Sequence, residues 1–281
     1  MKRILALLLA LLLLGGCGGT LAPLPKADET PPPDAVAPGA DAPARDCTIG
    51  YIHGEALLLY DEEGGLYALN VTDLLLTAQD ESALSVADLA VGQQVSVFFD
   101  GAVSLTYPAS FGEPTKLIVR GESTDLPGLY LKLFDELWEK DAGLNEGISV
   151  LAFQFQDALC GLPPAPPNTP DPSVQCPHVL TQAQKNALFY ILGNRLGYDV
   201  FESDFDSLQA ENYIVKEPNS PMLHFPGGLF FQLTVNDWDN DGFTFEFSKW
   251  RSSLGAYFLA DCKAICKSGV WNYTVGAEAI A

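Results

Sequence analysis

Near the carboxyl end of the chain, four consecutive segments alternate apolar and polar residues with a period of two. Successive side chains of a β-strand point to opposite faces of its sheet, so this alternation indicates strands that bury one face. Because short polar connections separate the segments, we expect them to form an antiparallel meander. The segments are Leu229 to Val235, Gly242 to Trp250, Ala256 to Asp261 and Val270 to Val275.

Helical patterns precede these strands. Apolar residues recur at helical spacing between Leu129 and Trp138, which predicts an amphipathic helix over residues 126–141. Thr181 and Gln184 match a capping box, so a second helix is expected from Gln182 to about Leu196. Helices followed by strands predict an α+β domain over residues 125–281, in which the helices pack on the antiparallel sheet. This order is similar to that of cone-shaped folds of the nuclear-transport-factor or cystatin kind.

Residues 47–122 predict a separate all-β domain. Turns such as Glu63-Gly64-Gly65 and Asp100-Gly101 contain residues that tolerate the positive φ angles of tight hairpins. Several short strands with this spacing suggest a small, partly closed OB-like barrel. The expected strands are Thr48 to His53, Glu55 to Tyr60, Gly65 to Val71, Gln94 to Phe99 and Lys116 to Arg120.

Parts of both domains resemble known proteins. Residues 88–93, 95–101 and 116–119 resemble the small OB-like domain of uncharacterised function found in many Firmicute lipoproteins. Residues 249–258 and 271–273 resemble the end of extracytoplasmic proteins from Clostridia. These resemblances imply an OB-like module followed by an α+β domain, and they bring no catalytic residue.

The amino-terminal segment predicts export and lipid attachment. Lys2 and Arg3 precede eleven apolar residues that lead into Gly15-Gly16-Cys17. A helix of that length covers roughly 16 Å, about half of a hydrocarbon core, so residues 1–16 suit a cleaved signal peptide. The segment resembles a bacterial lipobox, which implies acylation of Cys17 and attachment to the extracytoplasmic face of the cell membrane.

The segment that follows Cys17 predicts a tether. Residues 17–46 are rich in proline and alanine and have no periodic apolar pattern, so we expect them to be disordered. The chain carries a net charge of −21, and removal of Lys2 and Arg3 with the signal peptide makes it about −23. This acidity disfavours nucleic acid as a partner. The expected partners are the membrane, through Cys17, and a glycan or a peptide.

The remaining cysteines suggest one disulfide bond. Cys160 and Cys176 flank a proline-rich loop, and closing it would stabilise the fold by roughly 3 kcal/mol in the chain-entropy model. An exported compartment permits such a bond. The pairing of Cys47, Cys262 and Cys266 stays open, with a bridge between the last two across a bend as one alternative.

One short motif suggests a weak calcium site. Asp237, Asp239 and Asp241 precede a glycine as in the first half of an EF-hand loop. Ser248 stands where the bidentate glutamate is required, so a polar hairpin turn is the favoured interpretation. No other metal or cofactor is expected.

The sequence favours a noncatalytic binding or accessory module over an enzyme. The three histidines lie in different predicted elements, and no serine lies in a Gly-x-Ser-x-Gly turn. An extracytoplasmic hydrolase with an unrecognised active site remains the alternative. If the last sheet curls around its helices, a ligand surface could form, or the same residues could belong to the core. The candidate residues are Trp250, Arg251, Tyr257 and Trp271.

We predict that the mature protein begins at an acylated Cys17. Mass spectrometry of the polypeptide isolated from its own cells should find residues 1–16 removed and the Cys17 sulfur modified. Detection of the initiator Met1 together with a bare Cys17 thiol would contradict the lipoprotein interpretation.

Overall fold

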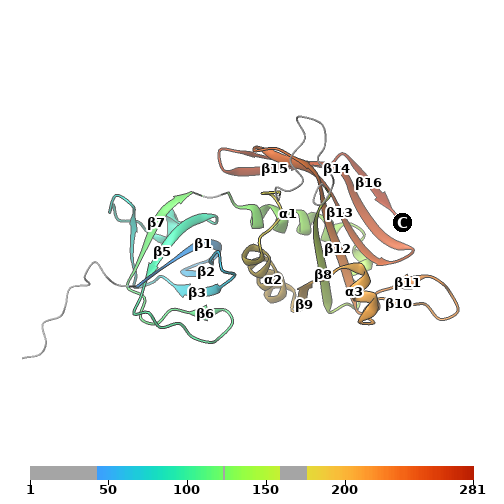
Figure 1. Ribbon diagram of the computed structural model, residues 1–281, viewed down its shortest axis with the longest axis horizontal. Coiled ribbons are helices and arrows are strands. Elements are labelled where there is room, and N and C mark those ends of the chain that lie inside the picture. The colour runs from blue at the N-terminus through green and yellow to red at the C-terminus, as the bar shows by residue number, and fades with distance from the viewer. Residues whose placement is uncertain (1–42, 123, 159–175) are drawn as a thin grey trace, which may run out of the picture. The chain divides into compact units, whose positions relative to one another are not determined.

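The computed structural model describes residues 43–122, 124–158 and 176–281 (Figure 1). These ranges are rich in β-structure, with two curled sheets and few helices. The predicted signal peptide, the predicted lipidation site Cys17, residues 17–42 of the predicted tether and Cys160, the predicted partner of Cys176, lie outside the described residues. No helix in the described ranges combines the length and the apolar character needed to cross a membrane.

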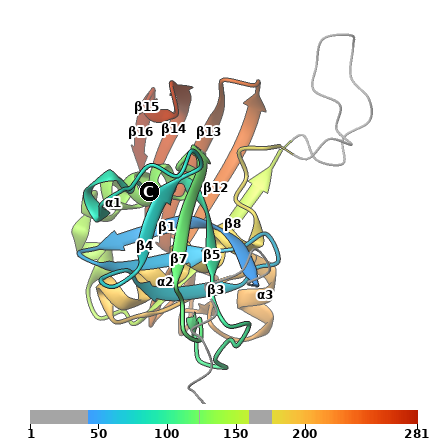
Figure 2. The same cartoon turned by 90° about the vertical axis from the view of Figure 1, so that its left-hand side faces the viewer.

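The first sheet is built from the strands that follow the predicted tether. Its order is β4-β7-β5-β1-β2-β3-β6, and Figure 2 shows β5 and β7 side by side. Strand β1 begins at Ala44, ahead of its expected start at Thr48, because residues 44–46 pair with β5. The expectation that the disordered tether extends to residue 46 is therefore wrong. The elements are β1 (Ala44–His53), β2 (Ala56–Tyr60), β3 (Leu66–Asn70), β4 (Leu75–Ala78), the 3₁₀-helix η1 (Val86–Asp88), β5 (Gln93–Phe98), β6 (Ala109–Ser110) and β7 (Lys116–Glu122).

Alternation along these strands separates a core from an outer face. In β1, Cys47 and Ile49 are buried in the core of the first sheet, whereas Asp46 and Thr48 occupy the opposite face. Strand β5 repeats the pattern, with Val95 and Val97 in the core. The outer face of the first sheet therefore carries polar side chains on two adjacent strands.

The second sheet combines the expected meander with two parallel strands. Neighbouring strands β12 to β15 pair antiparallel, which confirms the predicted meander. Strand β8 pairs parallel with both β12 and β9, so the prediction of a purely antiparallel sheet is wrong. The reason is that α2 connects β8 to β9 as a crossover, which brings the two strands into the sheet in the same direction.

The elements of this part of the chain are as follows. They are α1 (Leu126–Glu139), the 3₁₀-helix η2 (Ala142–Asn145), β8 (Val150–Asp157), α2 (Gln182–Leu196), β9 (Asp199–Glu202), α3 (Phe205–Ala210), β10 (Val215–Lys216), β11 (Leu223–His224), β12 (Gly228–Trp238), β13 (Gly242–Ser252), β14 (Gly255–Lys267), β15 (Val270–Thr274) and β16 (Ala277–Ile280).

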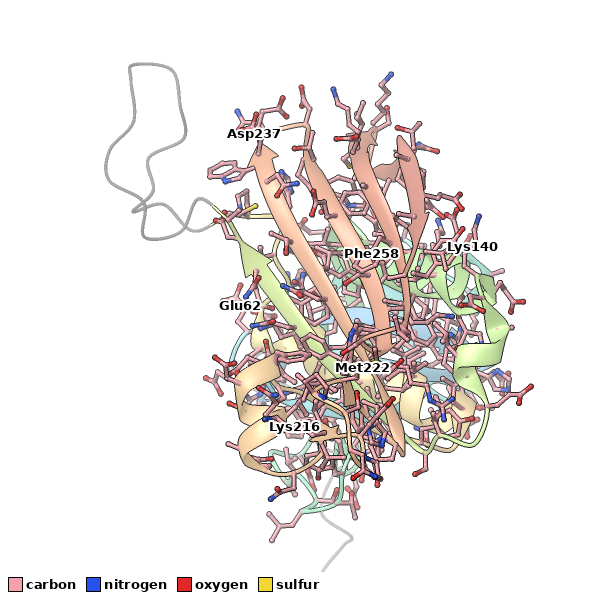
Figure 3. The ribbon with its side chains drawn as sticks, turned by 90° about the vertical axis from the view of Figure 1, so that its right-hand side faces the viewer. Glu62, Lys140, Lys216, Met222, Asp237 and Phe258 are labelled. Carbon is pink, nitrogen blue, oxygen red and sulfur yellow. The ribbon has the colours of Figure 1, made fainter. Side chains whose placement is uncertain are left out.

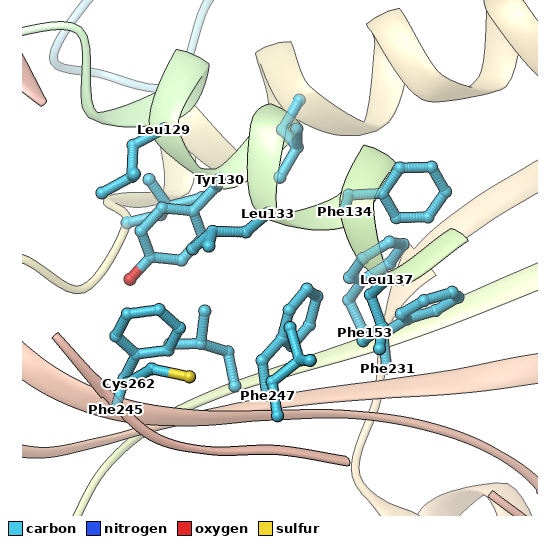
Figure 4. Packing of buried hydrophobic residues seen from close by; sticks show 14 of the residues in the cluster. Leu129, Tyr130, Leu133, Phe134, Leu137, Phe153, Phe231, Phe245, Phe247 and Cys262 are labelled. Carbon is cyan, nitrogen blue, oxygen red and sulfur yellow. The ribbon is translucent and has the colours of Figure 1, made fainter. Parts of the chain in front are cut away.

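Helix α1 covers one face of the second sheet. Its apolar residues, including Leu133 and Leu137, face Phe231 and Phe247 of the central strands (Figure 4). Helix α2 begins as its sequence predicts, because the Thr181 hydroxyl accepts a hydrogen bond from the backbone N–H of Gln184. The two predicted helices are thereby confirmed.

A buried lysine donates hydrogen bonds to the carboxyl-terminal end of α1. Lys249 of β13 is wholly buried, and its ammonium group lies 3.1 Å from the side-chain oxygen of Asn145. It also donates to the carbonyl oxygens of Trp138, Lys140 and Asp141. The last carbonyl groups of a helix have no partner within the helix. Lys249 supplies a shared donor for these groups and fastens α1 to the sheet.

Replacement of Lys249 by methionine is expected to lower the free energy of unfolding by about 1–3 kcal/mol, because the carbonyl groups lose their donor. Burial lowers the pKa of Lys249 from its ordinary 10.5 to about 8. Between these values the unfolded chain binds more protons than the folded protein, so the contribution of Lys249 to stability rises with pH across this window. The deficit of the variant should therefore grow as the pH rises.

Urea unfolding of both proteins at about pH 7 and about pH 10 measures this difference. Lys263→Met is the matched control, because Lys263 is exposed on the neighbouring strand β14. A deficit of the Lys249→Met variant that is the same at both pH values would contradict the expected titration.

Candidate functional site

The predicted aromatic ligand residues do not gather on one surface. Trp250 lies in the small core under α3, with its ring centroid 5.1 Å from that of Phe205. Tyr257 and Trp271 belong to the main core beneath α1, where they are 8% and 6% exposed. The two cores lie on opposite faces of the second sheet, so these side chains cannot line one ligand surface.

Arg251 has a structural role beside the second sheet. Its guanidinium group donates to the carbonyl oxygens of Leu144 and Glu146, at 2.7 and 2.6 Å. These bonds hold the loop that follows η2 against β13. Arg251 therefore binds the chain's own backbone instead of facing an open surface.

The predicted calcium motif forms the turn between β12 and β13. One carboxylate oxygen of Asp239 accepts hydrogen bonds from the backbone N–H groups of Asp241 and Gly242, at 2.9 and 2.8 Å. Asp237 lies at the end of β12 (Figure 3). Within the described ranges, no group of three or more ligating side chains is placed to hold a metal ion. The geometry supports the hairpin turn and gives the calcium hypothesis no support.

The cysteines of the described residues carry free thiols. Cys176 is buried and is bonded to no other described cysteine, and because Cys160 lies outside the described residues, the predicted bridge between them stays a prediction. Cys262 and Cys266 both lie on the continuous strand β14 and do not pair with each other. A bend that would bring these two sulfurs together is absent from this strand.

A cleft of about 880 Å³ lies on the outer face of the first sheet, where α2 begins. We call it the outer-face cleft. Residues of β1, β2, β5 and β7 line its floor, and the start of α2 lines one wall. The lining residues that matter for its chemistry are Tyr60, Thr48, Gln94, Arg120, Arg45 and Gln184.

Strand register places several of these side chains in one row. Thr48 of β1 pairs with Tyr60 of β2 on one side and with Gln94 of β5 on the other. On β7, Gly121 pairs with Gln94, so Arg120 lies next to the end of the row. Adjacent strands are about 4.8 Å apart, and the row from β2 to β7 therefore spans roughly 14 Å.

Helix α2 explains why part of this face is covered and part is open. Ala183 and Ala187 are small enough for the helix to pack closely on Leu58, Tyr60 and Leu66. A hydrogen bond of 3.0 Å from the Asn186 side chain to the Gly64 carbonyl oxygen fixes the contact. The remaining polar residues of β1, β5 and β7 are left uncovered beside the helix.

Tyr60 marks the boundary between the covered and the open parts. Its ring lies over Gly50, where a Cβ atom would approach the ring carbon Cδ1 to 3.1 Å. Its hydroxyl interacts with the side chains of Thr48 and Gln184, and burial raises its pKa. Tyr60 is only 7% exposed, so little of its ring is available to a ligand.

At one end of the cleft, the positive charge of Arg45 is balanced by two carboxylates of the chain itself. Its guanidinium group lies 3.1 Å from a carboxylate oxygen of Asp61 and 3.1 Å from one of Glu63. The buried Asp61 carboxylate also accepts from the Tyr67 hydroxyl, at 2.8 Å, and from the backbone N–H of Gly65, at 2.7 Å. This network stabilises the turn between β2 and β3. It occupies both carboxylate oxygens of Asp61 with partners from the chain itself.

At the other end, Arg120 is held by a neutral partner. Its Nε–H donates to the Ser96 hydroxyl at 2.8 Å, and that hydroxyl in turn donates to the Asp46 carboxylate. Ser96 is wholly buried, so the hydroxyl oxygen that accepts this hydrogen bond is held in place. Among the side chains that the structure describes, no carboxylate forms an ion pair with Arg120.

The side chains that line the cleft can form hydrogen bonds and ion pairs. None of its lining residues is a histidine. Cys47 is the one cysteine among the lining residues, but its side chain points into the core of the first sheet, and burial raises the pKa of its thiol to about 12. The lining of the outer-face cleft therefore offers hydrogen-bonding and charged side chains to a polar ligand.

None of the sequence-predicted site residues in the described ranges lines this cleft. Its residues come from four strands, the turn that follows β2, the start of α2 and Thr124, and no local motif connects them. The only sequence signal is alternation, since Asp46 and Thr48 face away from the apolar residues between them, as do Gln94 and Ser96. Such a pattern is also that of an ordinary solvated sheet face.

Comparison with protein-family models, with curated proteins and with solved structures finds no match to this chain.

Trp271 is expected to act in folding and not in ligand binding. The variant Trp271→Ala removes a buried indole that packs 5.6 Å from the ring of Phe243, and it should lower the free energy of unfolding by about 3–5 kcal/mol. Val270→Ala is the control, because the adjacent Val270 is 58% exposed and should change stability by less than about 0.5 kcal/mol. Equal stabilities of the two variants in urea unfolding would contradict the assignment of Trp271 to the core.

Proposed function

We propose that this chain is an extracytoplasmic lipoprotein, attached to the membrane through Cys17, that binds short peptides without catalysis. The amino-terminal sequence supports the placement. The outer-face cleft supports the binding, because it presents hydrogen-bonding side chains from adjacent strands on an otherwise open sheet face. This row of side chains is the observation on which the proposal rests.

The dimensions of the row suit a peptide of a few residues. An extended chain advances about 3.3 Å per residue, so a span of roughly 14 Å corresponds to about four residues. A peptide laid across the strands would meet Thr48 and Gln94 in its middle. Both side chains offer donors and acceptors that can match a peptide backbone.

The lining favours a peptide over a glycan. Sugar sites commonly present an exposed aromatic ring, and the one aromatic residue of the lining, Tyr60, is almost buried. The lining includes two arginines, and its acidic residues outnumber them by two. These acidic residues are Asp46, Asp61, Glu62 and Glu63. A peptide with a basic side chain complements this charge.

We also propose that the first sheet is an OB-like barrel and that residues 125–281 form a separate α+β domain with a cone-shaped sheet. Support comes from the buried clusters. Ile49 and Val97 belong to a core of the first sheet, whereas Leu133 and Phe231 belong to a different core beneath α1. Each sheet thus has its own hydrophobic core, as expected for separate domains.

Peptide binding can be tested with the folded mature protein and a soluble library of tetrapeptides. Each member contains one lysine at any position, and the library includes equal amounts of free acids and carboxamides. Affinity selection with mass spectrometry should enrich a subset of peptides. The variant Gln94→Trp places a large ring on the exposed centre of the row and should abolish enrichment.

Ala68→Trp is the matched control, since Ala68 is exposed on β3 and does not line the cleft. It should retain binding, and both variants should keep the unfolding temperature of the wild type. Selection with oligomers of N-acetylglucosamine tests the glycan alternative. The peptide proposal fails if no peptide is enriched by the wild type, or if Gln94→Trp enriches the same peptides.

A further inference from the structure

We propose that the outer-face cleft selects peptides with a free carboxyl terminus and that Arg120 binds this carboxylate. This inference rests on the proposed peptide-binding function and adds the chemistry by which a ligand would be chosen and oriented. It rests on a difference between the two arginines that line the cleft: Arg45 forms ion pairs with carboxylates of the chain, whereas Arg120 is bonded to a neutral hydroxyl.

Arg45 and Arg120 differ in what they already bind. Arg45 faces two carboxylates of the chain itself, Asp61 and Glu63, and its charge is compensated. Among the described residues and side chains, Arg120 has one hydrogen bond, which its Nε–H donates to the Ser96 hydroxyl. No hydrogen-bond partner of its two terminal nitrogens is found among the described backbone groups and side chains. Arg45 and Arg120 are the two cations of the lining, and among the described side chains only Arg45 has a carboxylate within ion-pair distance.

The bond to Ser96 orients the guanidinium group in advance. An exposed arginine loses side-chain entropy when it binds, and fixing its Nε beforehand reduces that loss. Ser96 is wholly buried, and its hydroxyl is itself oriented by Asp46. The terminal nitrogens then present paired N–H groups, whose geometry matches the two oxygens of a carboxylate.

The position of Arg120 gives the ligand a direction. Arg120 lies on β7 at one end of the row, whereas Glu62 and Glu63 follow β2 at the other end. A peptide with its carboxyl terminus at Arg120 would place its amino-terminal part, or a basic side chain, near these glutamates. The reverse orientation would bring the carboxylate to the acidic end and the positive charge to Arg120.

The test uses the most enriched tetrapeptide, synthesised as a free acid and as a carboxamide, in calorimetric titrations of the folded mature protein. The free acid should bind about 10- to 100-fold more tightly than the carboxamide, because a hydrogen-bonded pair of charges contributes about this much to affinity. The variant Arg120→Ala should lose this preference and bind both forms equally weakly. Arg120→Lys should recover only part of it, because an ammonium group lacks the paired donors.

Lys116→Ala is the matched control, because it removes one positive charge from the same strand outside the cleft. It should keep the preference for the free acid. Two further probes identify the source of the carboxylate: the carboxamide with an internal glutamate, and oligogalacturonate as an acidic sugar. Either of them binding as well as the free acid would overturn the assignment to a carboxyl terminus.

The possible failures are distinguishable. If neither peptide form binds to the wild type, the proposed peptide-binding function is wrong. If both forms bind equally well, or if Arg120→Ala keeps the preference, peptide binding stands and the role of Arg120 is wrong. Thermal unfolding of every variant confirms that the compared proteins are folded.

Discussion

Close packing of α2 against the outer face of the first sheet determines where a ligand could bind. The helix presents alanines at the contact, Ala183 and Ala187, and these allow it to lie directly on the apolar half of the face. That half is formed by Leu58, Tyr60 and Leu66 of β2 and β3. The polar half on β1, β5 and β7 is left open, and the first turn of α2 becomes a wall of the cleft. Larger residues at the alanine positions would hold the helix away and erase this boundary.

The elements that local sequence patterns define were predictable. Thr181 and Gln184 mark the start of α2 because a capping box is a local interaction, and the alternation from Leu229 onward marks strands because one face is buried. The parallel pairing of β8 was not predictable, because it depends on the route of the chain through α2. Aromatic residues such as Trp271 were equally ambiguous, since the same spacing serves a core or a ligand surface.

The cleft escaped prediction for a related reason. Register brings Thr48 and Gln94 together across a strand pair, although 45 positions separate them in the sequence. The ion pairs of Arg45 and the hydrogen bond of Arg120 to Ser96 are also contacts between residues far apart in the sequence. Composition indicated only an acidic chain, and it could not indicate that Arg120 has no ion-pair partner among the described side chains.

The uneven burial of the thiols has a practical consequence. Among the cysteines of the described residues, Cys47, Cys176 and Cys262 are enclosed, and Cys266 on β14 is partly accessible. Cys266 is the member of this group that an alkylating dye would reach in the folded protein. Attachment there would mark the second sheet and leave the lining of the outer-face cleft unmodified, whereas modification of the enclosed sulfurs would report transient opening of the cores.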